Sequence, residues 1–221
     1  MARIFFNKVE SYFIVTNYKV LFSTLSWQPQ LVPVNCLRSE ELDKFLNSKK
    51  ILLVRNPYDR LESFYRDKLQ VNPKSVSFTN EFKWQDCQYL LLNIIFERKG
   101  AYSATFELER DTLMGVSFDE FVSNYLPFVF QKEPHLVPQV LSFFYVDNKK
   151  NILDIEYDEV FKIDDKEDLI LLRDKFKIDT SINKNVTKNR GVLLTWSSFT
   201  RAIVNDLYKL DFESLNYSLI H

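Results

Sequence analysis

The sequence predicts an α/β fold in which a mostly parallel central sheet is flanked by helices. Short apolar runs rich in β-branched residues alternate along the chain with longer segments whose apolar residues recur at helical spacing. One of these runs, at residues 51–54, is apolar at every position, as expected for a parallel strand covered on both faces.

The predicted elements follow one another without an internal repeat, a low-complexity tract or a linker. We therefore expect a single domain over residues 1–221. Strands are expected at residues 11–16, 51–54, 143–146 and 152–155. Helices are expected from Ser39 onward, over residues 58–69 and 82–98, from Ser117 onward, and over residues 166–176 and 199–210. Residues 19–27 are expected to form a short helix or none, because two prolines follow.

Local signals mark the ends of three of these helices. Asn56 and Pro57 supply an N-cap and a first-turn proline for the helix that follows them. Gly100 is placed to close the long helix before it. Ser117 and Glu120 form the capping-box pattern at the start of the next helix. These signals support the alternation of strands and helices.

The composition and charge of the chain favour a globular protein that does not bind long polyanions. The 46% of hydrophobic residues can close a sizeable core. Lys and Arg number 29 against 30 for Asp and Glu, so the chain has no overall field for holding a long polyanion such as duplex DNA. We therefore expect no nucleic-acid partner, and any anion site must be local.

The cysteines, glycines and apolar runs exclude further classes of site and of cellular location. Cys36 and Cys87 lack a CxxC spacing, so we expect neither a disulfide nor a metal site. No run of about 18 apolar residues occurs, so neither a membrane span nor a secretory signal is expected and a cytoplasmic location is predicted. The chain has only three glycines, which excludes a glycine-rich phosphate loop of the Walker or dinucleotide type.

The most informative segment covers residues 52–69. Arg55 comes directly after a predicted parallel strand, at the edge where α/β sheets bind ligands, and a helix begins immediately afterwards. The free N–H groups of a helix N-terminus favour an anion, and Ser63 lies two turns into this helix. An arginine and a hydroxyl in this arrangement are suited to binding a monophosphate.

This segment resembles the 3′-phosphate-binding motif of sulfotransferases, with the pattern R-[DN]-P-[YF]-x-R-L-x-S-x-Y-x-x-K of the carbohydrate sulfotransferases. The resemblance implies a fold like that of the P-loop kinases, and 3′-phosphoadenosine-5′-phosphosulfate as the cosubstrate that gives up its sulfuryl group. It also implies that Arg55 and Ser63 hold the 3′-phosphate, and that the acceptor is a small molecule or a saccharide that carries a hydroxyl. No metal is required for this transfer.

The loop after the first strand, YKVLFST at residues 18–24, resembles the phosphosulfate loop P-K-x-[GA]-[ST]-[ST]-[ST] of the same family. The resemblance implies that Lys19, Ser23 and Thr24 bind the phosphosulfate, with Lys19 stabilising the leaving oxygen. Tyr18 replaces the usual proline, and Leu21 replaces a small residue. These departures leave open a binding protein that kept the fold while its phosphosulfate loop decayed.

A third segment, EPHLVPQ at residues 133–139, resembles the H-x-x-P-Q stretch of carbohydrate sulfotransferases. The reaction must remove a proton from the acceptor, and histidine is suited to that task near neutral pH. His135 is therefore the candidate catalytic base, with Glu62, Asp67 and Glu133 as alternatives.

Two C-terminal segments complete the resemblance, which spans nearly the whole chain. The basic loop around Arg190 is a candidate lid over the 3′-phosphate, and Arg190 itself is a candidate cofactor-binding residue. Residues 207–217 resemble the family's Y-x-x-D-[FY]-x-x-[FL]-x-Y tail and are predicted to pack against the core. A nucleotide-dependent kinase of related topology is the remaining enzymatic alternative, disfavoured because the chain lacks a Walker loop.

Overall fold

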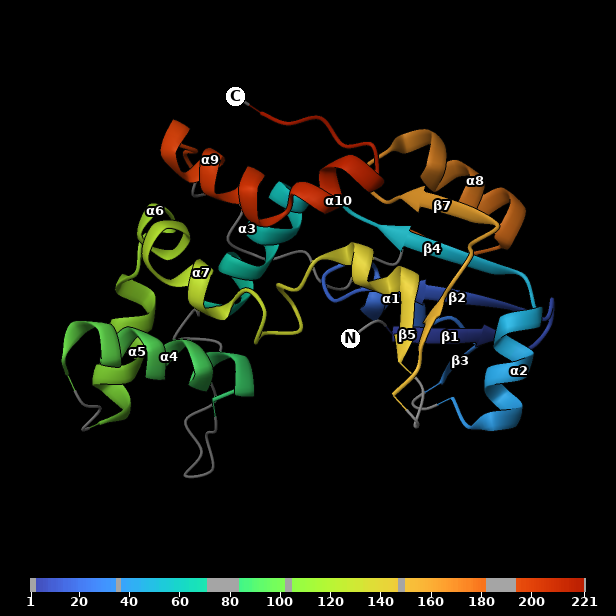
Figure 1. Ribbon diagram of the computed structural model, residues 1–221, viewed down its shortest axis with the longest axis horizontal. Coiled ribbons are helices and arrows are strands. Elements are labelled where there is room, and N and C mark those ends of the chain that lie inside the picture. The colour runs from blue at the N-terminus through green and yellow to red at the C-terminus, as the bar shows by residue number, and fades with distance from the viewer. Residues whose placement is uncertain are drawn as a thin grey trace. The chain divides into compact units, whose positions relative to one another are not determined.

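A computed structural model describes residues 3–34, 37–70, 84–101, 105–146, 150–181 and 194–220 (Figure 1). The chain divides into two compact units, and each is described by itself. We call the first the sheet unit; it comprises Met1–Asn56, Pro138–Val186 and Glu213–Tyr217. We call the second the helical unit; it comprises Pro57–Val137, Thr187–Phe212 and Ser218–His221.

The sheet unit contains a five-stranded sheet in the order β3-β1-β2-β4-β7. β2 pairs with β4 and β4 with β7 in parallel, whereas β1 runs antiparallel to both β2 and β3. The sheet is therefore mixed, and the prediction of a mostly parallel sheet is wrong. The strands are β1 (Arg3–Asn7), β2 (Tyr12–Thr16), β3 (Leu31–Val34), β4 (Lys50–Val54) and β7 (Glu159–Lys162).

The antiparallel half of the sheet has a local cause. After β1, the side-chain oxygen of Asn7 accepts hydrogen bonds from the backbone N–H groups of Val9 and Glu10, at 3.0 and 3.1 Å. This arrangement turns the chain back on itself, so that β1 and β2 form a hairpin. β3 contains Pro33, which an edge strand tolerates because its N–H need not join the ladder.

Helices cover both faces of the sheet (Figure 1). The side chains of β4 alternate, with Ile51 and Leu53 on one face and Leu52 and Val54 on the other, and all four are fully buried. This confirms the prediction for the apolar run at residues 51–54. The first face packs against α1 (Phe22–Ser26) and α8 (Lys166–Phe176), and the second against α2 (Ser39–Asn47) and the 3₁₀-helix η3 (Gln139–Phe143).

The strands expected at residues 143–146 and 152–155 form, but outside the main sheet. β5 (Phe144–Val146) and β6 (Ile152–Asp154) pair with each other as an antiparallel ribbon. Tyr145 and Ile155 pack into the core on the α2 side of the main sheet. β7, which the sequence analysis did not identify, takes the parallel position beside β4 instead.

The described elements of the helical unit are helices. Gly100 ends α4 in the left-handed conformation at φ 61°, and the Ser117 side chain accepts a hydrogen bond from the Glu120 backbone N–H, as predicted. The helix expected at residues 199–210 is divided in two at Tyr208. The elements are α3 (Pro57–Lys68), α4 (Asp86–Lys99), α5 (Phe106–Gly115), α6 (Phe118–Glu120), the π-helix η2 (Phe121–Tyr125), α7 (Leu126–Val129), α9 (Ser198–Leu207) and α10 (Lys209–Ser214), which begins in this unit. In the described part of the chain, every helix is too short or too polar to span a bilayer.

Candidate functional site

Two of the predicted site residues meet at one edge of the sheet unit. Lys19 lies in the loop after β2 and Arg55 directly follows β4, and these two strands are parallel neighbours with Thr16 opposite Leu53. Their loops therefore leave the sheet at the same edge, where ligands bind in α/β folds. An Nη atom of Arg55 donates a hydrogen bond to the carbonyl oxygen of Lys19, at 3.3 Å. The structure thus brings two sequence motifs together.

The loop after β2 is a tight turn between a strand and a short helix. Lys19 and Leu21 both adopt left-handed backbone conformations, with φ of 67° and 50°. The hydroxyl of Thr16 donates to the carbonyl oxygen of Val20, which closes the turn from inside. Leu21 stands where the family pattern has a small residue, and it adopts a conformation that glycine adopts at lower cost.

Gln139 fixes the backbone at the end of β4. Its Oε1 accepts a hydrogen bond from the Arg55 backbone N–H at 2.9 Å, and its Nε2 donates to the Arg55 carbonyl oxygen at 2.7 Å. Gln139 is fully buried. The last residue of the H-x-x-P-Q stretch therefore anchors the first residue of the 3′-phosphate motif. The sequence pattern that contains Gln139 did not predict this contact.

The other residues predicted to bind the sulfuryl donor differ in burial and in the unit to which they belong. Ser23 is half-buried on α1, whereas Thr24 is buried with 4% exposure. Ser63 is half-buried on α3 and belongs to the helical unit, while Arg55 belongs to the sheet unit. The shared 3′-phosphate grip of Arg55 and Ser63 thus stays a prediction. Arg190 lies outside the described residues.

His135 lies in a turn of the helical unit and contacts a buried carboxylate. Oε1 of Glu133 accepts a hydrogen bond from the His135 backbone N–H at 3.0 Å and also contacts Nδ1 of the His135 ring. The Glu133 side chain is 5% exposed, and that of His135 is 19% exposed. The Phe64 ring packs beside the imidazole, with ring centroids 5.9 Å apart. The imidazole is thus held on one side and partly open to solvent.

The backbone of the same turn is held by Arg60. Its guanidinium donates to the carbonyl oxygens of His135, with Nη2 at 3.0 Å, and of Val137. Nη1 of Arg60 lies 3.7 Å from Oδ2 of Asp211, and both side chains are buried. The Tyr208 hydroxyl donates to the carbonyl oxygen of Leu136 at 2.7 Å, and burial raises the pKa of Tyr208 above its ordinary value.

The sequence patterns did not predict this network, although all of its members lie in segments that resemble the family's patterns. Arg60 belongs to the 3′-phosphate pattern, and Tyr208 and Asp211 belong to the C-terminal pattern that was predicted to pack. The available signal was Asp211, because an aspartate in a segment predicted to pack against the core needs a cationic or hydrogen-bonding partner.

Comparison with known proteins decides the family. The sequence model of the sulfotransferase family matches residues 34–218. The chain belongs to the sulfotransferase family. Arg55, Ser63, His135 and Arg190 lie inside the matched range, whereas the loop that contains Lys19 precedes it. Comparisons with curated proteins and with solved structures give no significant match. Membership in this family implies a transferase that moves sulfuryl groups.

The other carboxylates proposed as the base of this sulfotransferase are engaged. Glu62 accepts a hydrogen bond from the Trp196 indole N–H at 2.7 Å and lies 3.5 Å from the Arg66 guanidinium. Asp67 forms an ion pair with Lys68 at 2.8 Å. Both carboxylates are thus engaged by neighbouring donors or cations.

One cluster of described residues offers ligand types that metals bind. Cys87, Glu133 and His135 each place one potential ligand atom within 4.8 Å of the others. The sequence predicted no such cluster, because Cys87 is far from the other two along the chain. Burial raises the pKa of the Cys87 thiol to about 11, so the thiol is protonated at neutral pH. A metal ion here must displace that proton before the sulfur can act as a ligand.

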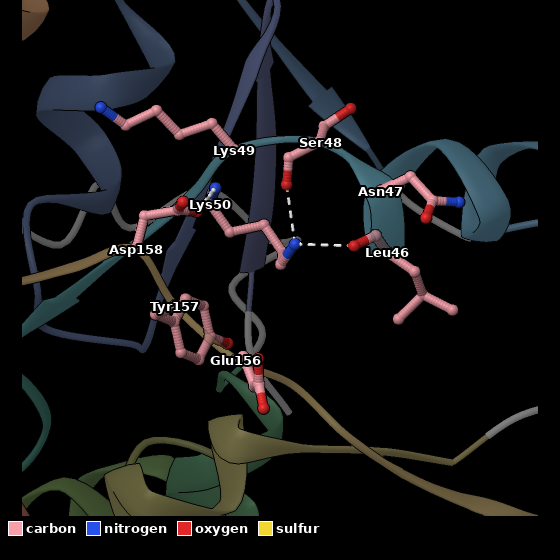
Figure 2. A pocket seen from close by; sticks show the side chains of 8 residues that line it. All are labelled: Leu46, Asn47, Ser48, Lys49, Lys50, Glu156, Tyr157 and Asp158. Carbon is pink, nitrogen blue, oxygen red and sulfur yellow. Dashed lines mark hydrogen bonds between the residues drawn. The ribbon is translucent and has the colours of Figure 1, made fainter.

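A shallow hollow of about 330 Å³ lies at the other end of β4 (Figure 2). It is lined by Leu46–Lys50 and Glu156–Asp158. Lys50 donates to the carbonyl oxygens of Leu46 and Ser48, at 2.9 and 2.7 Å, and its backbone N–H donates to Asp158. This hollow is at the N-terminal end of the strand, whereas Arg55 follows the C-terminal end. The hollow is therefore separate from the cationic edge of the sheet.

Proposed function

We propose that this sulfotransferase moves a sulfuryl group from 3′-phosphoadenosine-5′-phosphosulfate to a hydroxyl of its acceptor. The observation that supports the donor most directly is the meeting of Lys19 and Arg55 at the C-terminal ends of two parallel strands. The contact joins the Arg55 guanidinium to the backbone carbonyl of Lys19, so the two segments that carry these cationic residues are neighbours, as a donor with negative charge at both its 3′-phosphate and its phosphosulfate requires.

Arg55 is proposed to bind the 3′-phosphate together with Ser63. Its backbone is fixed by Gln139, and one guanidinium nitrogen is directed by the carbonyl oxygen of Lys19. A guanidinium that is already oriented loses less conformational entropy on binding an anion. Arg190 is proposed as a further contact to the same phosphate.

Lys19 is proposed to neutralise the oxygen that leaves sulfur. Sulfuryl transfer, like phosphoryl transfer, proceeds through a loose transition state, so positioning and charge neutralisation account for most of the catalysis. The hydroxyls of Ser23 and Thr24 are proposed to assist, and the greater exposure of Ser23 favours it over Thr24.

His135 is proposed as the base that accepts the acceptor's hydroxyl proton. The new bond joins the acceptor oxygen to sulfur, the bond from sulfur to the phosphate oxygen breaks, and adenosine 3′,5′-bisphosphate leaves. The proton from the hydroxyl moves to the imidazole. The resemblance to carbohydrate sulfotransferases makes a saccharide hydroxyl the proposed acceptor, and the cytoplasmic location stays a prediction.

Binding of adenosine 3′,5′-bisphosphate tests the donor assignment. We expect the parent protein to bind it without magnesium, and Arg55→Ala to weaken binding by about 2–4 kcal/mol, because a charge-assisted contact is lost. Adenosine 5′-phosphosulfate lacks the 3′-phosphate and should bind both proteins alike. Equal binding of the bisphosphate to both would refute the role of Arg55. A magnesium-dependent preference for ATP would indicate a kinase, and binding of neither ligand would indicate a decayed binding protein.

A further inference from the structure

We propose that Glu133 is the positioning residue for His135, holding its imidazole in the tautomer in which Nε2 carries the lone pair. The inference rests on the proposed function of His135 as the base. Both contacts come from one carboxylate oxygen, because Oε1 of Glu133 accepts the His135 backbone N–H and contacts Nδ1 of the ring. Glu133 therefore fixes both the backbone and the ring of the same residue.

The chemistry of the pair determines which nitrogen is protonated. An ionised carboxylate only accepts hydrogen bonds, so the Nδ1 that contacts it must carry the proton in the neutral imidazole. The lone pair is then on Nε2, the nitrogen proposed to take the acceptor's proton. Without the carboxylate, nothing in this contact distinguishes the two tautomers.

Burial of the Glu133 carboxylate makes its contact with His135 energetically important. The Glu133 side chain is only 5% exposed, and a buried carboxylate is costly unless polar groups satisfy it. Both of its described hydrogen-bond contacts are with His135. The His135 side chain keeps 19% exposure, so the ring is held from the inside and remains reachable from solvent.

The backbone of the turn is fixed separately. The carbonyl oxygens of three consecutive residues, His135, Leu136 and Val137, accept hydrogen bonds from the side chains of Arg60 and Tyr208. These contacts set the position of the turn but do not touch the imidazole. Phe64 packs beside the imidazole, and Glu133 contacts its Nδ1, so the polar contact of the ring with Glu133 is independent of the backbone contacts.

The pair shares its residues with the cluster of potential metal ligands that includes Cys87. Because Oε1 of Glu133 contacts Nδ1 of His135, a metal ion held by these two atoms would replace this hydrogen bond.

Nitrogen-15 NMR of the imidazole groups reads the tautomer without any sulfuryl transfer. The chain has two histidines, so His221→Asn leaves His135 as the only source of these signals. In this background we expect the Nδ1–H tautomer, and Glu133→Ala should move the spectrum toward the Nε2–H tautomer. An Nε2–H tautomer in the parent background, or an unchanged spectrum in Glu133→Ala, would overturn the proposal.

Kinetics supply the second measurement. Glu133→Ala should lower kcat by at least about 10-fold while leaving donor affinity unchanged, because base assistance is weakened and not removed. Glu133→Gln can turn either its oxygen or an N–H group toward Nδ1, so it should retain more kcat than Glu133→Ala and give a mixture of the two tautomers. If Glu133→Ala does not fold, an unchanged tautomer together with an unchanged kcat in Glu133→Gln would overturn the proposal. Donor affinity that falls together with kcat would contradict a positioning role.

His135→Ala separates failure of this inference from failure of the proposed function. If the tautomer responds to Glu133 as expected but His135→Ala keeps full turnover, the positioning contact exists and His135 is not the base. If His135→Ala loses turnover by about 10²-fold while the tautomer is insensitive to Glu133, His135 is the base and Glu133 does not position it.

Discussion

The side-chain amide of Gln139 forms two hydrogen bonds with the backbone of Arg55, at 2.9 and 2.7 Å. The two residues are 84 positions apart in the sequence. Each comes from a separate segment that resembles a sulfotransferase pattern, and the fully buried amide joins the two segments within the sheet unit. The orientation of Arg55 at the end of β4 therefore depends on a residue outside its own motif.

Gln139→Leu tests this dependence. The apolar side chain has a similar size but leaves the N–H and carbonyl groups of Arg55 without these partners, at about 1–3 kcal/mol for each unsatisfied group. We expect a lower free energy of unfolding and weaker binding of adenosine 3′,5′-bisphosphate, by about 10-fold. Chemical unfolding and calorimetric titration on the same preparation measure both effects.

The control is Tyr12→Phe, which removes another buried hydrogen bond of the sheet unit. The Tyr12 hydroxyl donates to the Phe176 carbonyl oxygen at 2.9 Å, away from Arg55. Tyr12→Phe should lower stability by about 1 kcal/mol without changing bisphosphate affinity. Equal loss of affinity in the two variants would show that Gln139 acts through general stability alone.

Lys19→Ala should lower kcat more than it weakens donor binding, because the charge on the leaving oxygen is greatest in the transition state. Alanine is subject to the same restriction on positive φ as lysine, so the loop at φ 67° is not relieved by the change. Steady-state kinetics and donor titration provide the two numbers. Lys49→Ala is the control, since it removes the same charge at the other end of the sheet, where Lys49 pairs with Glu159.

Two outcomes would contradict the proposed role of Lys19. Equal losses in kcat and donor affinity would make it a residue that only binds the donor. An unchanged kcat would place the phosphosulfate loop elsewhere in the chain. This outcome matters because Lys19 precedes the range matched by the family model, so the family match does not support its role.

The elements that the sequence predicted correctly are those with strong local signals. The apolar run at residues 51–54 of β4 and the end of α4 at Gly100 needed no tertiary information, and α8 has the predicted bounds. β1 and β7 were missed because their patterns are short and charged residues flank or interrupt them. Both strands are stabilised by pairing with neighbours that sequence periodicity does not reveal.

In the candidate site, too, features with a local sequence signal were predicted, and contacts between distant residues were not. Arg55 and Lys19 were each predicted to follow a strand and to bind the donor, and the structure brings the two residues together. The contacts of Gln139 and Asp211 were not predicted, because their partners are distant in the sequence. Such contacts depend on the three-dimensional register of buried polar groups, which a single sequence does not specify.

Cys87 should contribute to a loss of stability at alkaline pH. Burial raises the pKa of its thiol from an ordinary value of 9.0 to about 11, so the unfolded chain releases the thiol proton more readily than the folded protein. The stabilising contribution is complete below about pH 9 and is lost as the pH rises toward 11. At pH 10 the loss amounts to about 1.4 kcal/mol.

Cys87→Ala removes this titration. The variant should be less stable than the parent at pH 7, because a small buried side chain is truncated, and this deficit should shrink by about 1.4 kcal/mol at pH 10. Urea unfolding under reducing conditions at both pH values measures the change. Burial also raises the pKa of Tyr65, and that of Tyr125 to about 12. The parent and Cys87→Ala should therefore both lose some stability in alkali, and only the difference between them reports on Cys87. A deficit that is the same at pH 7 and pH 10 would contradict the role of Cys87.

The buried pair of Arg60 and Asp211 should behave as a unit in a double-mutant cycle. Arg60→Met leaves the Asp211 carboxylate without its cation and removes the hydrogen bonds to the turn that carries His135, so we expect a loss of about 3–5 kcal/mol. Asp211→Asn should also be strongly destabilising, because the buried guanidinium loses its counter-charge.

The double variant Arg60→Met/Asp211→Asn should be more stable than the sum of the two single losses implies, by at least about 1 kcal/mol, because no unpaired charge remains buried. It should not recover full stability, since the carbonyl oxygens of His135 and Val137 still lack their donor. Asp174→Ala is the control. It removes a carboxylate paired with Arg173 on the exposed surface, where both side chains are about 60% accessible, and should change stability little. Strictly additive losses in the cycle would mean that Arg60 stabilises the turn through its hydrogen bonds alone and that the ion pair contributes nothing.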